Sequence, residues 1–391
     1  AGTGPVRSAA TSSGPTGARA PRSTGSAQRS GGPGRTEKVE HVTDPSDPSG
    51  AARTTTEADA GPGVGESDLV TVIMPARDEE KFIGAALDGI QAQDYRNLQI
   101  VVVVDGATRD RTAEVVEERA AADPRIELLH NPQGGIPRAL NIALAAARGR
   151  WLVRVDAHST VGTDYVRKNV SRLQEGRWGG VGGRKDGHGV TPAGRAIAAA
   201  LGSPFGVGGS VYHHGEVEQE VDHVPFGAYP VALLRELGGW DEDLVANEDY
   251  EFDYRLRMAG HRLLFDPDIK IRWHSRQTIG DLYKQYRRYG HGKVAVALKH
   301  PASMRPRHVL VPAFLAWLVL AGLVALRRPR IAAAMVAPYA AALTAASVKT
   351  GRDLPRESRK YVAPAFLAMH IGWGVGFWAG VADALRRAVN R

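Results

Sequence analysis

Between residues 69 and 156, short runs of β-branched and apolar residues alternate with segments of helical length, and this alternation constrains the fold more than any other feature. The runs are LVTVIMP (69–75), LQIVVVVD (98–105), RIELLH (125–130) and WLVRVD (151–156). After the first run, Ile83, Leu87 and Ile90 form an apolar stripe with helical spacing, and IPRALNIALAAARG (136–149) carries a similar stripe. Strands that alternate with helices predict a mostly parallel sheet, which binds ligands at the carboxyl ends of its strands.

The segment 1–68 has a different composition, dominated by Gly, Ser, Thr, Pro, Ala and Arg. Because it almost lacks large apolar side chains, it cannot bury enough surface to offset the entropy of ordering. We expect a disordered tail. It has no apolar core of a secretory signal, so we do not interpret it as one.

Three apolar stretches lie near the carboxyl end, at 309–326, 331–347 and 361–380. Each has about the length of roughly 20 residues that a helix needs to cross a hydrocarbon core, and none contains Asp, Glu, Lys or Arg. Three in succession favour membrane helices over buried core helices. The basic segment 349–360 predicts a cytoplasmic loop, and a cytoplasmic preceding domain if the stretches cross in alternation. Because the turn RRPR (327–330) opposes this rule, a shallow hairpin for the first two stretches stays open.

The chain has 391 residues, no cysteine and a formal net charge of +8. The lack of cysteine excludes disulfides and cysteine-based zinc sites. A positive balance suits nucleic acid, anionic lipid or phosphorylated substrates. Since much of the basic excess lies in the tail and beside the apolar stretches, and no nucleic-acid module is recognisable, we do not expect nucleic acid as a partner.

Polar residues follow the predicted strands. Asp105 lies where a carboxylate can accept hydrogen bonds from a base or ribose, although a simple Asp-Gly turn explains it equally well. Arg138 lies in GGIPRALN (134–141), where backbone amides at a helix start favour phosphate. That stretch is also an ordinary helix start, because it matches neither a P-loop nor a dinucleotide-binding fingerprint.

The fourth run ends in Asp156 and His158, in D-x-H order. Side chains at i and i+2 of an extended segment point the same way, so we expect the carboxylate and the imidazole to lie together. Such a pair suits a divalent ion, Mn²⁺ in preference to Mg²⁺. A polar strand end is the alternative interpretation.

Two further groups occur in the second half. Glu248 and Asp249 follow Asn247, a residue suited to capping the helix that we predict up to Gly260. They are candidates for a general base, and complementing the helix dipole is the alternative. Gln285 and Arg288 share one helical face in the basic, aromatic segment 281–293, which suits either a membrane surface or a diphosphate.

In their order and spacing, these motifs resemble the family 2 glycosyltransferases of GT-A fold, from about Val70 to Lys293. The matching stretches are VIMPARDEE, VVVVDGATRDRT, GGIPRALNIALAAARGRWLVRVDAH, PFGAYPVALLRELGGWDEDLVANEDYEFDYRLRMAG and QYRRYG. Within that family the chain is most similar to membrane-anchored bacterial exopolysaccharide enzymes of the succinoglycan type. The resemblance implies a Rossmann-like, mostly parallel sheet flanked by helices. We therefore expect three parts: the tail (1–68), which lies outside the resemblance, a catalytic domain (69–300) and a membrane region (301–391).

The resemblance also assigns roles to residues. The nucleotide pocket takes Pro75, Arg77 and Glu79, with Asp105 near the base, while Asp156 and His158 match the D-x-D metal motif. The catalytic residues are Asp249, as the base, and Glu248 beside it. Gln285 and Arg288 of a Q-x-x-R-W motif are also assigned to catalysis. The chain departs from the family pattern in having His158 for an acid, one acid after the second strand, and Tyr289 for tryptophan.

The implied reaction is an inverting, metal-dependent transfer of sugar from a nucleotide-sugar, a UDP-sugar in preference to a GDP-sugar, with Mn²⁺ or Mg²⁺. Arg138 and Arg288 would assist the departing diphosphate. The expected acceptor is a lipid-linked saccharide or a lipid phosphate, at a cell membrane crossed several times. The alternatives are a processive polysaccharide synthase, a polyprenyl-phosphate sugar transferase and a non-catalytic, membrane-tethered nucleotide-sugar-binding module. Sugar, linkage and oligomeric state are left open by the sequence.

Overall fold

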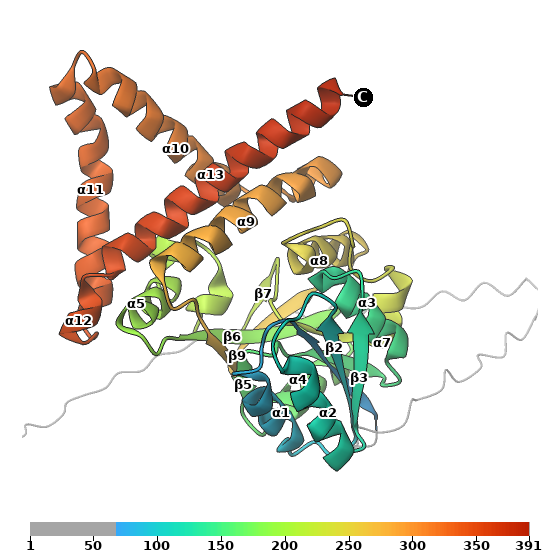
Figure 1. Cartoon of the computed structure of the whole chain (residues 1–391). Helices are drawn as coiled ribbons and strands as arrows, with labels where there is room; N and C mark the ends of the chain where they lie inside the picture. The colour runs from blue at the N-terminus through green and yellow to red at the C-terminus, as the bar shows by residue number, and fades with distance from the viewer. Residues whose placement is uncertain (1–67, 391) are drawn as a thin grey trace, which may run out of the picture. The chain divides into compact units, whose positions relative to one another are not determined.

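A nine-stranded mixed sheet runs through the part of the chain that the computed structural model describes, residues 68–390 (Figure 1). The strands are β1 Val70–Ala76, β2 Leu98–Asp105, β3 Ile126–Asn131, β4 Trp151–Arg154, β5 Ser159–Val161, β6 Gly180–His188, β7 Gln219–Val221, β8 Ala228–Pro230 and β9 Leu263–His274. Their order is β3-β2-β1-β4-β8-β6-β9-β5, and β7 pairs with β9. The predicted tail, 1–68, lies outside the described residues except for Asp68.

The first four strands are the four predicted runs, and they pair in parallel. Their alternation follows the two-residue period of a strand: Val70, Val72 and Met74 face one hydrophobic cluster, and Ile73 faces the other. The expectation of a mostly parallel sheet is confirmed for this half, and β6 also pairs in parallel with β9. Beyond β4, strand β8 pairs antiparallel with both β4 and β6, so the sheet as a whole is mixed.

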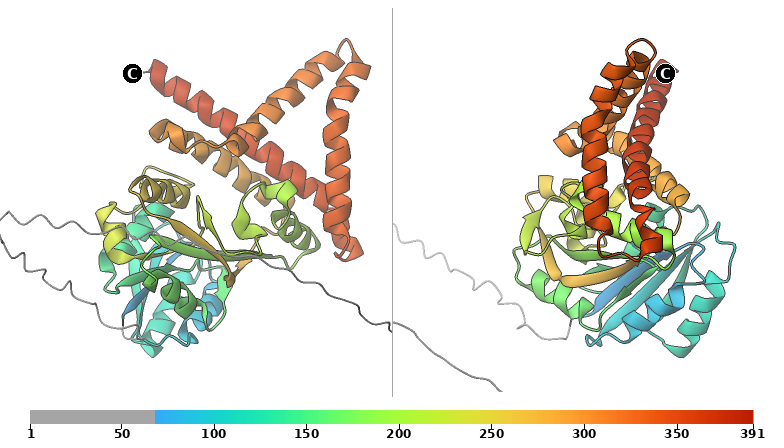
Figure 2. Two further views of the ribbon diagram at one scale, coloured as in Figure 1. Left: turned by 180° about the vertical axis from the view of Figure 1, so that it is seen from behind. Right: turned by 90° about the vertical axis from the view of Figure 1, so that its left-hand side faces the viewer.

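Helices cover both faces of the sheet (Figure 2). One cluster contains apolar side chains of α1, α2, α4 and α5, and the other contains those of α3, α7 and α8. These helices are α1 Ile83–Gln91, α2 Thr112–Ala122, α3 Ile136–Ala146, α4 Tyr165–Gln174, α5 Pro192–Leu201, α7 Val231–Glu236 and α8 Glu248–Met258. The Gly-rich stretch 202–214 contains α6 Pro204–Val207 and the 3₁₀ turn η1 Val211–His213.

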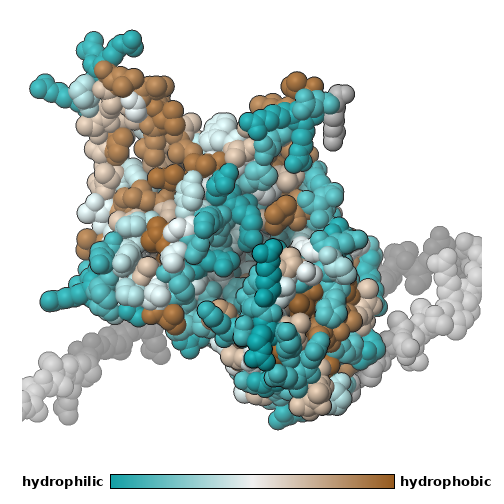
Figure 3. Space-filling view, viewed as in Figure 1, coloured by the Kyte–Doolittle hydropathy of each residue, from teal (hydrophilic) through white to brown (hydrophobic). Residues whose placement is uncertain are grey.

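Five helices form the carboxyl-terminal third: α9 Ile279–Lys299, α10 Pro306–Ala325, α11 Pro329–Gly351, the short α12 Arg356–Arg359 and α13 Val362–Val389, with the 3₁₀ turn η2 Pro301–Ser303 after α9. Three segments are long and apolar enough to cross a membrane: α10, α11 and the segment Arg356–Val389. Helices α10 and α11 form an arm on which apolar side chains gather at the surface (Figure 3). In contrast, α13 packs along α9 and against α5.

Candidate active site

A buried arginine at the carboxyl end of β4 joins the two predicted acidic motifs. Arg154 donates from Nε to Oδ1 of Asp156 at 2.9 Å and from Nη1 to Oδ1 of Asp249 at 2.6 Å. The same Nη1 lies 3.7 Å from Oε1 of Glu248, and the Arg154 side chain is 4% exposed. The D-x-H acid and the E-D pair, about ninety residues apart, therefore share one cation at the edge of the sheet where ligands are expected.

Burial and the neighbouring charges shift the pKa values of groups in this cluster. Burial disfavours the charge of Arg154, but the attraction of Asp156, Asp249 and Glu248 raises the pKa of its guanidinium above the ordinary value. Burial, together with the charge of Asp249, raises the pKa of Glu248 to about 7. Near neutral pH the two adjacent acids are therefore unequal, because Glu248 holds a proton over part of the range.

A second buried cation, Lys185 of β6, lies beside the cluster. Its Nζ is 3.7 Å from the ring centroid of Trp273 and 4.5 Å from that of Phe226. Burial lowers the pKa of Lys185 to about 8, against the opposing attraction of Asp156. The sequence analysis missed both cations. A signal existed only for Arg154, which interrupts an otherwise apolar strand.

Backbone strain accompanies the site. Among residues 68–390, three residues other than glycine have φ between +50° and +70°: Asp78 at 53°, Phe226 at 54° and Asn247 at 67°. Phe226 places its ring centroid 5.3 Å from Cζ of Arg154. Asn247 directly precedes the acidic pair, and its Nδ2 donates to the Tyr289 carbonyl oxygen at 3.0 Å instead of capping α8. Such strain persists where surrounding contacts hold it, and it is typical of functional sites.

His158 contacts residues other than those of the Arg154 cluster. Ala157 and His158 form a turn after β4, so the segment does not have the extended geometry that we expected. Nε2 of His158 accepts a hydrogen bond from Nε1 of Trp273 at 2.7 Å. Nδ1 therefore carries the proton, and it lies 2.9 Å from Oε1 of Glu79. In this arrangement both ring nitrogens of His158 are engaged.

The donor set fits a divalent ion with few protein ligands. No group of three His, Asp or Glu side chains gathers in metal-binding geometry within residues 68–390. Arg154 engages only Oδ1 of Asp156, which leaves the second carboxylate oxygen for an ion. Mg²⁺ and similar ions bind through one or two carboxylates, with substrate phosphates and water completing the shell. His158 can become a ligand only after Nε2 leaves the Trp273 indole.

The other predicted nucleotide-pocket residues have varied surroundings. Asp105 accepts hydrogen bonds from the backbone amides of Ala107 at 2.8 Å and Gly135 at 2.9 Å, the bonds expected of a structural turn. Arg138 pairs with Glu242 at 3.0 Å, and no contact joins it to the Arg154 cluster in the described chain. Pro75 lies in β1. Arg77 is exposed, 3.7 Å from Asp78.

Helix α9 carries Gln285 and Arg288 and meets the loop before α8. The bond from Asn247 to the Tyr289 carbonyl fixes this contact. Gln285 is buried, whereas Arg288 is exposed, with Cζ 5.9 Å from the Tyr289 ring centroid. Burial raises the pKa of Tyr289, and the charges of Glu248 and Asp156 add to the increase while Arg288 opposes it. The Q-x-x-R helix therefore adjoins the acidic pair.

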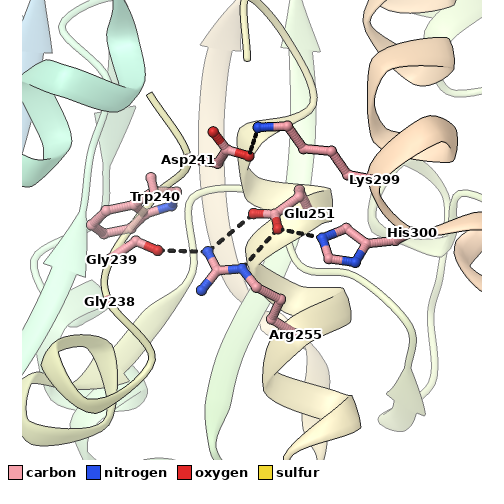
Figure 4. Close-up of a pocket in the computed structure, with 8 residues that line it drawn as sticks. All are labelled: Gly238, Gly239, Trp240, Asp241, Glu251, Arg255, Lys299 and His300. Carbon is pink, nitrogen blue, oxygen red and sulfur yellow. Dashed lines mark hydrogen bonds and ion pairs between the residues drawn. The ribbon is translucent and has the colours of Figure 1, made fainter. Parts of the chain in front are cut away.

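A pocket of about 360 Å³ lies at the junction of α8 and the end of α9 (Figure 4). Glu251, two residues beyond Asp249, is buried there between Arg255 at 2.7 Å and His300 at 2.8 Å. Lys299 pairs with Asp241 across the upper side of the pocket. Since these charged side chains are paired within the protein, their interactions stabilise the helix junction. The pocket lies apart from the Arg154 cluster.

Comparison with known proteins supplies the family. Residues 71–206 match the family described as "Glycosyl transferase family 2", and residues 225–348 match "Glycosyl transferase family group 2". The chain is 30% identical over 318 residues to the succinoglycan biosynthesis protein ExoA of Rhizobium meliloti, covering 81% of this chain and 96% of that protein.

Two further similarities extend the comparison. A Methanococcus voltae protein named "Dolichyl N-acetyl-alpha-D-glucosaminyl phosphate 3-beta-D-2,3-diacetamido-2,3-dideoxy-beta-D-glucuronosyltransferase" is 25% identical, over 58% of this chain and 73% of its own. The structure resembles the Pyrobaculum calidifontis mannosyltransferase PcManGT in complex with GDP-Man and Mn²⁺, with a TM-score of 0.53 and 24% identity, over 80% of this chain and 87% of that chain. The latter likeness supports the GT-A fold. The chain belongs to the family 2 glycosyltransferases and is a glycosyltransferase enzyme related to those of exopolysaccharide synthesis.

Proposed function

We propose that the protein transfers a sugar from a nucleotide-sugar to a hydroxyl or phosphate oxygen of a lipid-linked acceptor, with inversion at the anomeric carbon. The observation that carries this proposal is the shared cation: Arg154 holds Asp156 and Asp249 together, 2.9 Å and 2.6 Å from its nitrogens. Asp156, which we assign to the sugar donor, and Asp249, which we assign to the acceptor, are thereby held together at the carboxyl end of β4.

In this proposal Asp249 accepts the proton of the acceptor hydroxyl as its oxygen bonds to the anomeric carbon. The bond from that carbon to the diphosphate oxygen breaks, and the nucleoside diphosphate leaves with the electron pair. When Asp249 becomes neutral, Arg154 loses one ion-pair partner while negative charge grows on the leaving group. Arg154 and Lys185 therefore supply positive charge at the moment it is needed. No covalent enzyme intermediate is required.

A divalent ion, Mn²⁺ or Mg²⁺, would bind the free oxygen of Asp156, with His158 as a second ligand after it releases Trp273. When bound, it would neutralise charge on the diphosphate. If the acceptor is a lipid phosphate without a proton, Asp249 would have no proton to accept. The contribution of Asp249 to the rate of transfer therefore depends on the type of acceptor. A UDP-sugar is the first donor to test, and GDP-mannose is the second.

Membrane attachment supports a lipid-linked acceptor. The α10 and α11 arm is apolar and exposed, with Leu310 70% exposed and Leu323 61% exposed, as expected for contact with lipid. Arg195 of α5 pairs with Glu357 at 3.0 Å, so the basic loop 349–360 lies on the same side as the catalytic domain. A cytoplasmic domain follows from the excess of Lys and Arg in that loop.

The test is transfer measured with UDP- and GDP-sugars, with and without Mn²⁺, for the wild-type protein and Asp249→Asn. Because a general base contributes about 100- to 10,000-fold, we expect the variant to lose that factor in rate while its donor affinity, measured by calorimetry, is retained. Asp243→Asn is the matched control, since Asp243 lies in the same loop region with its side chain 85% exposed. Transfer by Asp249→Asn at the wild-type rate would show that the base is wrongly assigned.

A further inference from the structure

Helix α13 differs from the other two apolar segments in its surroundings. Its first half contributes Ala365, Phe366 and Met369, all fully buried, to the same hydrophobic cluster as the sheet strands β1 and β2. Half of its most apolar window is buried, against 17% for α10 and 6% for α11. Side chains that belong to the core of the catalytic domain cannot at the same time face hydrocarbon.

The second half of α13 runs beside α9 (Figure 2). The two helices approach at backbone distance, because a Cβ added to Gly372 would lie 2.9 Å from the Tyr283 carbonyl oxygen, and one added to Gly380 would lie 3.0 Å from that of His291. Gly376 contacts Arg287 between these two points. The contacts advance in the same direction along both helices, so α9 and α13 are parallel over at least two turns.

Helix α9 is not a membrane helix. It is not among the three segments apolar enough to cross, and Lys284, Arg287 and Arg288 are exposed on it. Such charges are expensive in a hydrocarbon core and favour the water or headgroup region. A helix parallel to α9 and in backbone contact with it shares that depth. An ion pair between His291 and Asp383, at 3.1 Å, continues the contact beyond the apolar stretch.

We propose that α13 does not cross the membrane but lies with α9 in the membrane interface, so that within residues 68–390 only α10 and α11 cross. The side of α13 that faces away from α9 contacts the lipid surface. Trp378 and Leu385 are exposed there, 46% and 63%, and Arg386 and Arg387 follow, the combination by which interfacial helices bind anionic lipid. The carboxyl terminus then returns to the side of the catalytic domain.

Because the chain contains no cysteine, single-cysteine labelling in the full-length protein tests this proposal directly. Arg352→Cys lies before α12 and Arg387→Cys lies in the last turn of α13, both at exposed positions. Arg96→Cys marks the catalytic domain, and Arg328→Cys marks the turn between α10 and α11. Each variant is treated with a membrane-impermeant maleimide in sealed vesicles of both orientations, and again after addition of detergent.

We expect Arg387→Cys to be labelled from the same side as Arg352→Cys and Arg96→Cys, and Arg328→Cys from the opposite side. Labelling of Arg387→Cys from the side opposite to Arg352→Cys would mean that α13 crosses, and would overturn the proposal. The labelling does not depend on transfer, so its outcome is separable from that of the base assignment. Sugar transfer by each variant shows that the fold is retained.

Discussion

The contact between α9 and α13 links the membrane region to the Q-x-x-R motif, and one glycine tests it. In Gly376→Ala the new Cβ would lie 2.7 Å from the carbonyl carbon of Arg287 and 2.9 Å from its Cα. Non-bonded carbons prefer about 3.5–4.0 Å, so the helices must separate by about 1 Å. Overpacking of this kind costs about 1–3 kcal/mol, from which the better helix propensity of alanine recovers about 1 kcal/mol.

The same displacement moves Gln285 and Arg288, which lie on α9 within one turn of Arg287. A shift of about 1 Å at reacting groups can cost up to about 100-fold in rate. We therefore expect Gly376→Ala to lower both the thermal unfolding midpoint in detergent micelles and kcat for sugar transfer. Gly322→Ala on α10 is the matched control, because nothing lies within 4 Å of its added Cβ. If Gly376→Ala unfolds at the same temperature as Gly322→Ala and transfers sugar at the wild-type rate, the helix contact has been misjudged.

Further predictions concern the Arg154 cluster and His158. Arg154→Lys keeps the charge but loses the planar fork that binds two carboxylates, so kcat should fall about tenfold; an unchanged kcat would remove Arg154 from the account. The raised pKa of Glu248 means that its stabilising effect is complete below the unfolded value of 4.5 and is lost as pH rises through about 7. Glu248→Gln should therefore flatten the fall in unfolding midpoint between these pH values, and an identical slope would contradict the shift. Trp273→Phe frees Nε2 of His158, so Mn²⁺ affinity should rise about tenfold in a titration followed by electron paramagnetic resonance, and no rise would exclude His158 as a ligand.

Local sequence patterns were sufficient for the parallel half of the sheet. The runs at 69–75, 98–105 and 151–156 are buried on both faces, which is why they consist of almost uninterrupted apolar residues, whereas the edge strand at 125–130 is only half-buried. The mixed half of the sheet is harder to predict. Strand β8 has three residues, and β9 extends through the polar Asp266 and Asp268, so neither carries a clear strand signal.

The acids that contact Arg154 follow sequence motifs, whereas the cations Arg154 and Lys185 do not. Asp156 and Asp249 follow recognisable motifs, whereas their link through Arg154 depends on strand register and on the strained turn at Phe226. The Asn247 side chain also illustrates this limit, since its long-range bond to Tyr289 replaces the local cap that the sequence predicts. A turn interrupts the extended chain after β4, and His158 there contacts Trp273 and Glu79. Tertiary contacts decided each of these cases.

The central claim is a single displacement at the anomeric carbon assisted by Asp249. The configuration of that carbon in the first transfer product, determined by proton NMR, tests this claim most directly. We predict the configuration opposite to that of the donor. Retention of the donor configuration would exclude a single in-line displacement, and would contradict the account.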